Sequence, residues 1–295
     1  MTMKKNLEKW SLNDFDLRLI DLALAEDLGD AFQDITTETL FLETTQIFNA
    51  RIISKNPEPI IICGLPVVSE ILSKFSSSCF MKTHFKDGEV LSSGETLLTL
   101  TGTARELLMA ERTILNFLQR LCAVATLTSK FVKAVEGTAL KILDTRKTTP
   151  GFRHLEKYAV YCGGGVNHRV GLYDALLIKD THIDLLGGVS NTLEKLPHTM
   201  EHLFPVIIEI RTLNELSIVL NNGRDKITRI LLDNMSLSEM SEAALLCRGI
   251  FPTEASGNIS LNNILDIAKT NVDYASIGKL THSAGSVDLS MKCDF

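Results

Sequence analysis

The chain has 295 residues, of which 45% are apolar and 22% are charged, and its formal net charge is −6 at pH 7. This balance is typical of a globular protein and excludes a disordered or fibrous one. The negative charge provides no overall positive field for nucleic acid, so an anionic small ligand must be held by a local group of basic side chains.

Six cysteines are spread along the chain without C-x-x-C or metal-ligand spacing. This pattern favours free, mostly buried thiols in a reducing compartment over a disulfide framework. Residues 1–10 include lysines but no apolar stretch of signal-peptide length, and no later apolar run approaches the length of a membrane span. We therefore expect a cytoplasmic protein that binds neither nucleic acid nor membranes.

The first part of the chain predicts a mixed α/β unit. Residues 12–28 carry apolar side chains at helical spacing, and Gly29 is placed to end that helix. Short strand-like runs follow at 50–53, 60–63, 81–85 and 97–100. Residues 104–126 then predict a long helix without glycine or proline, which has the length of a helix that links two domains.

From about residue 139, short apolar runs alternate with helical patterns. Six runs predict strands, at 140–145, 175–180, 206–209, 230–234, 251–257 and 274–278. Predicted helices lie between several of them, at 213–220, 236–246 and 261–269. This alternation predicts a parallel sheet that is buried on both faces. Because a TIM barrel needs eight strands and no G-x-G-x-x-G motif follows the first strand, we expect a smaller, closed or nearly closed barrel.

Polar residues follow the predicted strands at their carboxyl ends, where ligands bind in barrels and open α/β sheets. These residues are Arg146, Lys147, Lys179, Asp180, Glu209, Asp233, Asn234, Ser256, Gly257, Asn258, Gly278 and Lys279. For any single residue, a strand that simply ends in a polar loop is an equally good explanation. For the whole set that explanation is weaker, so we expect one binding site at this end of the sheet.

The segment 144–180 holds the densest basic group. Its members are Arg146, Lys147, Arg153, His154, Lys157, His168, Arg169 and Lys179. Arginine offers a planar fork to a carboxylate or phosphate, whereas lysine acts as a point charge, so the group suits a ligand with several negative charges. Arg153, His154 and Lys157 lie on a predicted helix, and we expect them to be solvated or paired instead of catalytic.

Glycine-containing turns complete the pattern. The turns 256–258 and 278–279 follow late strands, and backbone N–H groups at such turns bind phosphate. The glycines at 163–165 allow a sharp turn that carries His168 and Arg169 inward, with a flexible surface loop as the alternative. Glu209 and Asp233 can hold Mg²⁺ jointly with a pyrophosphate. His282 is expected to be a structural histidine.

Several blocks of the sequence resemble the quinolinate phosphoribosyltransferase family. They are 25–30, 111–120, 144–151, 163–169, 177–180, 232–235, 254–258 and 278–283, and the resemblance runs from about residue 19 to residue 289. The blocks Thr145-Arg146-Lys147-Thr148 and Asn167-His168-Arg169 are specific to this family, whereas the glycine turns alone are not. Two positions depart from the family pattern, since Ile207 stands in place of a glutamate and Thr181 in place of an asparagine.

The resemblance implies an N-terminal α/β sandwich domain at residues 1–118. It implies a six-stranded open α/β barrel with the active site at residues 119–284, and a segment at 285–295 that packs back on the N-terminal domain. It further implies a homodimer with shared active sites, or a hexamer made of dimers. The implied reaction joins quinolinate to phosphoribosyl pyrophosphate with decarboxylation and yields nicotinate mononucleotide, pyrophosphate and CO₂, with Mg²⁺ and without an organic cofactor.

Roles for individual residues come from the same resemblance. Arg112 matches an arginine that reaches into the partner subunit's site. The residues that match substrate-binding positions are Thr145, Arg146, His168, Arg169 and Lys179. Lys147 matches a lysine between the two substrates, and Glu209 and Asp233 match an acidic pair near the ribose and the magnesium. The positions that match backbone phosphate contacts are Ser256, Gly257, Asn258 and Gly278.

Three other functions remain open at the level of sequence. The same fold can act on a mono-acid such as nicotinate without decarboxylation. Lys179, which follows an apolar strand, can form a Schiff base as in barrel aldolases. A non-catalytic phosphate-binding or regulatory protein is the third alternative, although such a protein has no need to keep every basic residue of the site.

Overall fold

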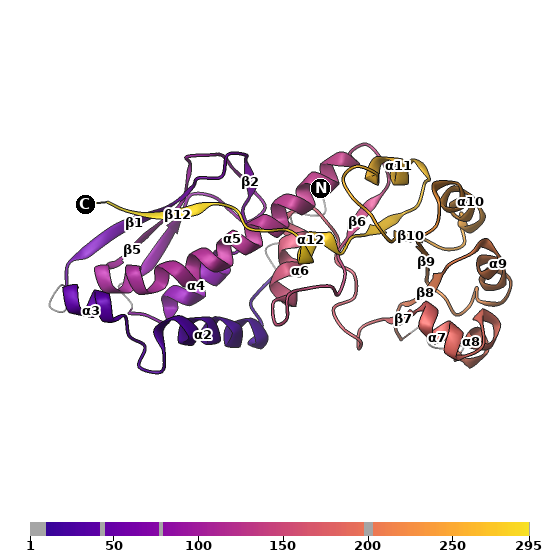
Figure 1. The fold of residues 1–295 in the computed structure, drawn as a ribbon, viewed down its shortest axis with the longest axis horizontal. Helices are drawn as coiled ribbons and strands as arrows, with labels where there is room; N and C mark the ends of the chain where they lie inside the picture. The colour runs from indigo at the N-terminus through magenta and orange to yellow at the C-terminus, as the bar shows by residue number, and fades with distance from the viewer. Residues whose placement is uncertain (1–9, 42–44, 77–78, 198–202, 295) are drawn as a thin grey trace. The chain divides into compact units, whose positions relative to one another are not determined.

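The computed structural model describes residues 10–41, 45–76, 79–197 and 203–294 (Figure 1). The chain divides into two compact units: Met1–Ser129, Thr148–Gly164 and Thr281–Phe295 form the first, and Lys130–Lys147 and Gly165–Leu280 form the second. The expected boundary near residue 118 falls inside helix α5 (Ala104–Ala134), and residues 148–164 group with the first unit. The predicted domain bounds, 1–118, 119–284 and 285–295, therefore stay a prediction. Residues 1–9 and 295, which belong to the first and last of these ranges, lie outside the described residues.

A four-stranded antiparallel sheet forms the centre of the first unit. Its order is β12-β1-β5-β3, with β1 (Ile47–Ser54), β3 (Phe80–Thr83), β5 (Thr96–Thr103) and β12 (Leu289–Asp294). A separate two-stranded sheet joins β2 (Ile60–Ile61) to β4 (Val90–Leu91). The last strand pairs with β1 over its whole length, from Asn49 opposite Asp294 to Ser54 opposite Leu289.

Cross-strand pairs of apolar side chains hold this sheet to its helices. Ala50 lies opposite Leu100, and Ile52 lies opposite Leu98, and all four side chains are fully buried. Alternate residues of a strand face the same side, so these pairs form one apolar face. Helix α4 (Leu65–Ser73) packs against β3. The expected α/β sandwich is confirmed.

The helices of the first unit begin and end at recognisable caps. Helix α2 (Asp14–Leu28) starts after Asn13, whose side chain accepts the N–H of Asp16, and it ends at Gly29. This cap places the start of the helix two residues after the expected position. The other helices of this unit are α3 (Ile35–Phe41) and α6 (Arg153–Cys162), and α12 (Lys279–His282) leads into its last segment.

Helix α5 is longer than its pattern predicts and continues to Ala134 instead of residue 126. The threonines near the expected end do not stop it, because their hydroxyls bond within the helix. Thr126 Oγ1 donates to the Cys122 carbonyl at 2.6 Å, and Thr128 Oγ1 donates to the Val124 carbonyl at 2.8 Å. A hydroxyl that is satisfied in this way lets threonine remain inside a helix. None of the described helices is long and apolar enough to span a membrane.

The second unit contains a six-stranded sheet in which every neighbouring pair is parallel. Its order is β6-β11-β10-β9-β8-β7, with β6 (Lys141–Leu143), β7 (Leu176–Ile178), β8 (Val206–Ile210), β9 (Arg229–Asp233), β10 (Thr253–Ser256) and β11 (Tyr274–Ser276). All six strands agree with the sequence pattern. Strands β6 and β7 form the two edges of the sheet, so the barrel is open, as expected.

Helices connect the strands of this sheet. They are α7 (Asp180–Leu185), α8 (Val189–Lys195), α9 (Leu213–Asn222), α10 (Leu237–Cys247) and α11 (Ile264–Lys269). Thr212 caps α9, and Ser236 forms a capping box with Glu239 at the start of α10. The short helices α7 and α8 were not predicted, because the glycines at 187 and 188 interrupt any helical periodicity.

A buried ion pair ties α5 to α6 within the first unit. The Glu156 side chain is fully buried, and its Oε1 lies 2.6 Å from Arg120 Nη2. The same carboxylate accepts hydrogen bonds from the backbone N–H and the hydroxyl of Thr149. Arg120 also donates to the carbonyl of Thr281. Because α6 carries the glycine loop that follows it, this ion pair fixes the start of that loop.

We expect Arg120→Met to lower the free energy of unfolding by about 3 kcal/mol, because it leaves a buried carboxylate without its charged partner. Urea denaturation measures this change. The matched control is Arg105→Met on the same helix, where the arginine is half exposed and pairs with Glu38 at the surface. That change is expected to cost less than about 1 kcal/mol. Equal losses in the two variants would contradict the structural role of the Arg120–Glu156 pair.

Candidate functional site

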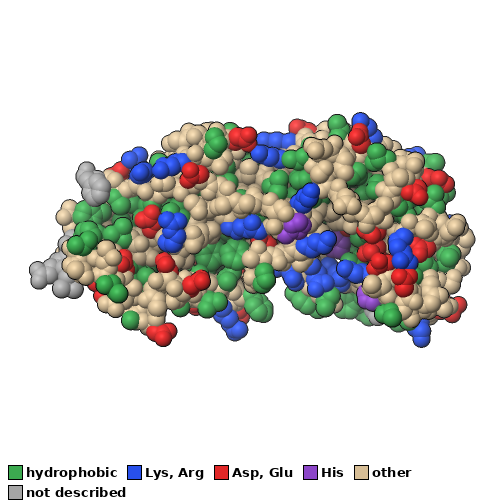
Figure 2. Space-filling model, in the orientation of Figure 1, with side chains coloured by type: hydrophobic (Ala, Val, Ile, Leu, Met, Phe, Trp, Pro, Cys, Tyr) green, Lys and Arg blue, Asp and Glu red, His purple; other side chains and the backbone are tan. Residues whose placement is uncertain are grey.

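Charged side chains gather at the carboxyl ends of the barrel strands. Lys179 and Asp180 follow β7, Glu209 lies near the end of β8, Asp233 ends β9 and Ser256 ends β10. The carboxyl ends of neighbouring parallel strands share one edge of the sheet, so these groups lie close together. Figure 2 shows basic and acidic side chains gathered next to each other in the half of the picture that holds the barrel strands.

Asp144 organises the basic loop that leads into β7. It directly follows β6, is fully buried, and accepts hydrogen bonds from the Asn167 amide at 2.6 Å and the His168 N–H at 2.8 Å. A parallel bridge between Leu143 and Val166 lays the loop along β6. The segment is therefore fixed to the sheet, which excludes the flexible surface loop. Asp144 was not predicted as a site residue, although its place directly after an apolar run and before a basic loop was the available signal.

Arg146 and Arg169 lie close enough to repel each other. Burial lowers the pKa of the Arg169 guanidinium, the positive charge of Arg146 lowers it further, and Asp174 acts in the opposite direction. Arg169 Nη1 donates to the Ala175 carbonyl at 3.0 Å. However, the Nε atoms of both arginines are buried and have no hydrogen-bond partner within the described parts of the chain. Buried hydrogen-bond donors without partners are rare in proteins. Two such donors on neighbouring, positively charged guanidinium groups suit an anionic ligand.

His168 lies beside the buried carboxylate of Glu254, whose Oε1 makes no hydrogen bond within the described residues. Its Nδ1 accepts the N–H of Arg169 at 2.7 Å, so a neutral ring carries its proton on Nε2, which lies 3.5 Å from Glu254 Oε1. Arg229 Nη1 lies 3.0 Å from the other oxygen of Glu254. Burial acts to raise the pKa of Glu254, but His168 and Arg229 outweigh it and hold this pKa below its ordinary value. Glu254 and Arg229 were missed as site residues, because their partners are distant in the sequence.

Acidic groups form the other side of the site. Burial raises the pKa of Glu209, and the negative charges of Asp233 and Asp180 raise it further, while Lys179 and the Asp180 N–H act against them. Oxygen donors of this kind suit Mg²⁺, which usually takes one or two carboxylates together with water and phosphate oxygens. Within the described residues these carboxylates do not form a compact group of three ligands.

The turns after β9 and β10 are locked to each other. Gly257 has a φ of +97°, and a Cβ at this position would lie 2.1 Å from the Asn234 side-chain oxygen, so only glycine fits. Asn258 also has positive φ, and its Nδ2 donates to Asn234 Oδ1 at 3.2 Å. The Asn234 N–H donates to the Ser256 carbonyl. Turns of this conformation expose backbone N–H groups and form anion-binding concavities.

The second unit contains every predicted site residue except Arg112. These residues are Thr145, Arg146, Lys147, His168, Arg169, Lys179, Glu209, Asp233, Ser256, Gly257, Asn258 and Gly278. The Thr145 hydroxyl accepts the N–H of Lys147 at 3.0 Å, which shapes the turn after β6. Arg112 is exposed on α5, in the first unit.

The three basic residues expected outside the site lie on α6 in the first unit. His154 pairs with Asp16, and Arg153 donates to the Thr148 hydroxyl, so their predicted pairing is confirmed. Lys157 is only 3% exposed, so of the two predicted alternatives it is not solvated. His282 is exposed, and its Nδ1 lies 2.6 Å from the Ser283 hydroxyl.

An open α/β barrel with unsatisfied arginines and glycine turns at its strand ends places the protein among the barrel enzymes that handle phosphorylated substrates. The chain matches the profiles of one known protein family. The profile of the "Quinolinate phosphoribosyl transferase, N-terminal domain" matches residues 34–122, and that of the C-terminal domain matches residues 124–292. The chain belongs to the quinolinate phosphoribosyl transferase family.

Relatives extend over nearly the full chain. A probable nicotinate-nucleotide pyrophosphorylase (carboxylating) of Bacillus subtilis is 38% identical, with 93% of this chain and 92% of the relative covered. Quinolinate phosphoribosyltransferase (decarboxylating) 1 of Nicotiana glauca is also 38% identical, with coverages of 95% and 83%. The solved nicotinate-nucleotide pyrophosphorylase of Francisella tularensis superimposes with a TM-score of 0.89 at 37% identity, with coverages of 97% and 98%.

We expect Glu209→Gln to raise the free energy of unfolding at pH 8. The wild-type side chain has a raised pKa, so it destabilises the fold as the pH rises through that pKa and the carboxylate becomes charged. Glutamine has no charge and keeps an oxygen that can accept the Asp180 N–H. Below the ordinary pKa of 4.5 the difference between variant and wild type should vanish. Urea unfolding between pH 4 and about pH 8 measures this trend.

We expect Glu254→Gln to change the free energy of unfolding in the opposite direction. The lowered pKa of Glu254 stabilises the fold above the ordinary pKa of 4.5, and this contribution is lost as the pH falls through the lowered value. The variant should therefore be less stable than the wild type at neutral pH and approach it in acid. A Glu209→Gln protein that is less stable at pH 8, or a Glu254→Gln protein that is more stable at neutral pH, would refute these charge assignments.

Proposed function

We propose that the protein transfers the phosphoribosyl group of phosphoribosyl pyrophosphate to quinolinate and releases CO₂, pyrophosphate and nicotinate mononucleotide. The observation that carries the proposal is the pair Arg146 and Arg169, whose buried Nε groups lack partners among the described residues. Quinolinate has two adjacent carboxylates, and guanidinium forks bind carboxylates through two parallel hydrogen bonds. The names of the Bacillus and Nicotiana relatives support the same activity.

The remaining donors around these arginines complete a site for a dicarboxylate in this proposal. His168 is oriented by Glu254 and by the Arg169 N–H, and it lies in the loop that Asp144 holds to β6. Lys179 provides a point charge at the end of β7, and Thr145 shapes the turn that carries Arg146. Arg112, exposed on α5, supplies a further guanidinium to the site of a second subunit.

The phosphoribosyl group is proposed to lie between the acidic pair and the glycine turns. Backbone N–H groups of Ser256, Gly257, Asn258 and Gly278 would bind its 5′-phosphate. Glu209 and Asp233 would face the ribose and hold Mg²⁺ jointly with pyrophosphate oxygens. When bound, Mg²⁺ would neutralise negative charge on the departing pyrophosphate.

The chemistry proceeds by positioning and preorganised charge. The basic residues aim the pyridine nitrogen at C1 of the ribose, and the new N–C bond forms as the bond to pyrophosphate breaks. Lys147 stabilises the leaving group, while Glu209 and Asp233 stabilise positive charge at C1. The ring nitrogen is then cationic, and its charge stabilises the electron pair that stays on the neighbouring ring carbon when the carboxylate leaves as CO₂. A proton from solvent replaces the carboxylate, so no organic cofactor is needed.

The proposal also includes an oligomeric state, which rests on the family resemblance, and a cellular compartment. A homodimer, or a hexamer built from dimers, would let the partner's Arg112 complete each site. Cytoplasmic location is supported by the cysteines, all six of which are free thiols and five of which are buried.

One assay tests the activity directly. Purified protein, phosphoribosyl pyrophosphate and Mg²⁺ are incubated with quinolinate or with nicotinate, and both CO₂ and nicotinate mononucleotide are measured. Quinolinate is expected to give equal amounts of the two products. Product from nicotinate alone would establish the mono-acid alternative, and borohydride trapping of Lys179 with a carbonyl compound would establish an aldolase. A protein that is inactive with both acids would not support a transferase.

We expect Arg146→Ala and Arg169→Ala each to reduce kcat/KM for quinolinate by about 30-fold to several thousand-fold. This range corresponds to the roughly 2–5 kcal/mol lost when one partner of a buried charged hydrogen bond is removed. Arg224→Ala is the control, because this arginine is exposed after α9 in the same unit. Steady-state kinetics measure all three, and unchanged values in both site variants would reject the dicarboxylate site.

A further inference from the structure

A second group of ligand-type side chains lies in the first unit. Cys63 follows β2, Asp87 lies in the turn between β3 and β4, and Cys162 ends α6. Their two sulfurs and a carboxylate oxygen all lie within 4.8 Å of one another, which no other group of three His, Cys, Asp or Glu does in the described ranges. We propose that these three residues bind a zinc ion.

The spacing of the three atoms is close to that of a zinc site. Zinc binds sulfur at about 2.3 Å and carboxylate oxygen at about 2.0–2.2 Å, so ligand atoms around one tetrahedral ion lie roughly 3.6–3.8 Å apart. The observed upper limit of 4.8 Å exceeds this spacing by only about 1 Å. Thiolate sulfur also selects zinc over the hard cations Mg²⁺ and Ca²⁺. The donor set therefore differs in kind from the oxygen donors of the barrel.

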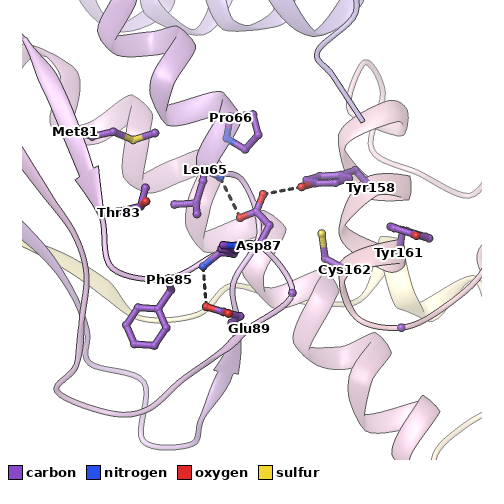
Figure 3. A pocket seen from close by; sticks show the side chains of 13 residues that line it. Leu65, Pro66, Met81, Thr83, Phe85, Asp87, Glu89, Tyr158, Tyr161 and Cys162 are labelled. Atoms are coloured by element: carbon purple, nitrogen blue, oxygen red, sulfur yellow. Dashed lines mark hydrogen bonds between the residues drawn. The ribbon is translucent and has the colours of Figure 1, made fainter. Parts of the chain in front are cut away.

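Outer hydrogen bonds hold Asp87 in place. Its carboxylate accepts the Tyr158 hydroxyl at 2.8 Å and the backbone N–H of Leu65 at 3.2 Å (Figure 3). It also accepts the backbone N–H of Gly64 at 3.1 Å. Such contacts orient metal ligands and contribute to their affinity. Capping the start of α4 explains the two backbone contacts. It does not explain why two buried cysteines lie beside the same carboxylate.

Both cysteines are fixed by the glycine that follows them. Gly64 has a φ of +116°, and at Gly163 a Cβ would lie 2.3 Å from the Ala125 carbonyl oxygen. Cys122 on α5 adds a further restraint, because its sulfur accepts the Cys63 N–H at 3.3 Å and its thiol donates to the Cys63 carbonyl at 3.4 Å. The ligand positions are thus set by packed backbone, which is the preorganisation that a metal site needs.

A cavity of about 720 Å³ gives the site access to solvent. Asp87 and Cys162 line it together with mainly apolar side chains such as Leu65, Met81 and Phe85 (Figure 3). With three protein ligands, a tetrahedral zinc ion has one position left, which water or an anionic small ligand can fill from the cavity. All of these residues belong to the first unit. The proposal is therefore independent of the reaction proposed for the barrel.

The test uses full-length protein without an affinity tag, reduced and stripped of metal with a chelator. Zinc is titrated against a chromogenic chelator, and Co²⁺ serves as a spectroscopic probe because its charge-transfer band reports thiolate ligands. We expect one zinc per chain and a thiolate band with cobalt. Cobalt bound by the barrel carboxylates would give no such band.

Variants assign the ligands. Cys63→Ser and Cys162→Ser are expected to weaken zinc binding at least about 100-fold, and Tyr158→Phe about 10–100-fold, as outer-shell changes do. Matched controls are Cys247→Ser, a buried thiol on α10 in the second unit, and Tyr161→Phe, which lines the same cavity. Both should bind zinc as the wild type does. Circular dichroism checks folding, and Tyr158→Phe keeps both thiols if a cysteine variant fails to fold.

Three results would overturn the proposal. They are a wild-type protein that takes up no zinc after reduction, a cobalt complex without the thiolate band, and a Cys162→Ser protein that binds zinc with wild-type affinity. A Cys63–Cys162 disulfide in the purified protein, together with no zinc uptake once it is reduced, would assign the pair to redox chemistry instead.

Discussion

The hydrogen bonds from Asn167 and His168 to the buried carboxylate of Asp144 are the interaction on which the barrel site depends. They attach the loop after the three glycines to the end of β6. That attachment brings Arg169 beside Arg146 and turns the His168 ring toward Glu254. Basic side chains at the strand ends are therefore positioned by buried carboxylates of the barrel strands and the loops that follow them. Moving the Asp144 carboxylate would displace Asn167 and His168 together.

Like charges face each other on both sides of this site. Arg146 and Arg169 repel each other, and Glu209 is close to two aspartates. Each group is less stable in isolation than it would be with a counter-charge, which is the usual compromise between stability and activity in an enzyme site. In the proposed reaction, a dianionic substrate would relieve the first repulsion, and cationic charge at the ribose would relieve the second.

The sequence predicted the parts of the fold that depend on local pattern. All six barrel strands were found, because buried parallel strands form short apolar runs at regular spacing. The length of α5 was underestimated, because the threonine hydroxyls are satisfied only by bonds seen in three dimensions. Glu254 and the Cys63–Asp87–Cys162 group were missed, because their contacts join residues that are far apart in the chain. The burial of Lys157 was not predictable either, since helical periodicity alone does not reveal which other element covers a side chain.

The pairing of β12 with β1 has a consequence for how the protein is made. The sheet of the first unit takes its outer strand from residues 289–294, while its other strands lie within residues 47–103. During translation, the sheet therefore remains incomplete until the barrel has already emerged from the ribosome. In that interval β1 exposes an unpaired edge that can recruit strands from other chains. The nascent protein therefore carries an aggregation-prone edge on β1 until residues 289–294 have emerged and paired with it.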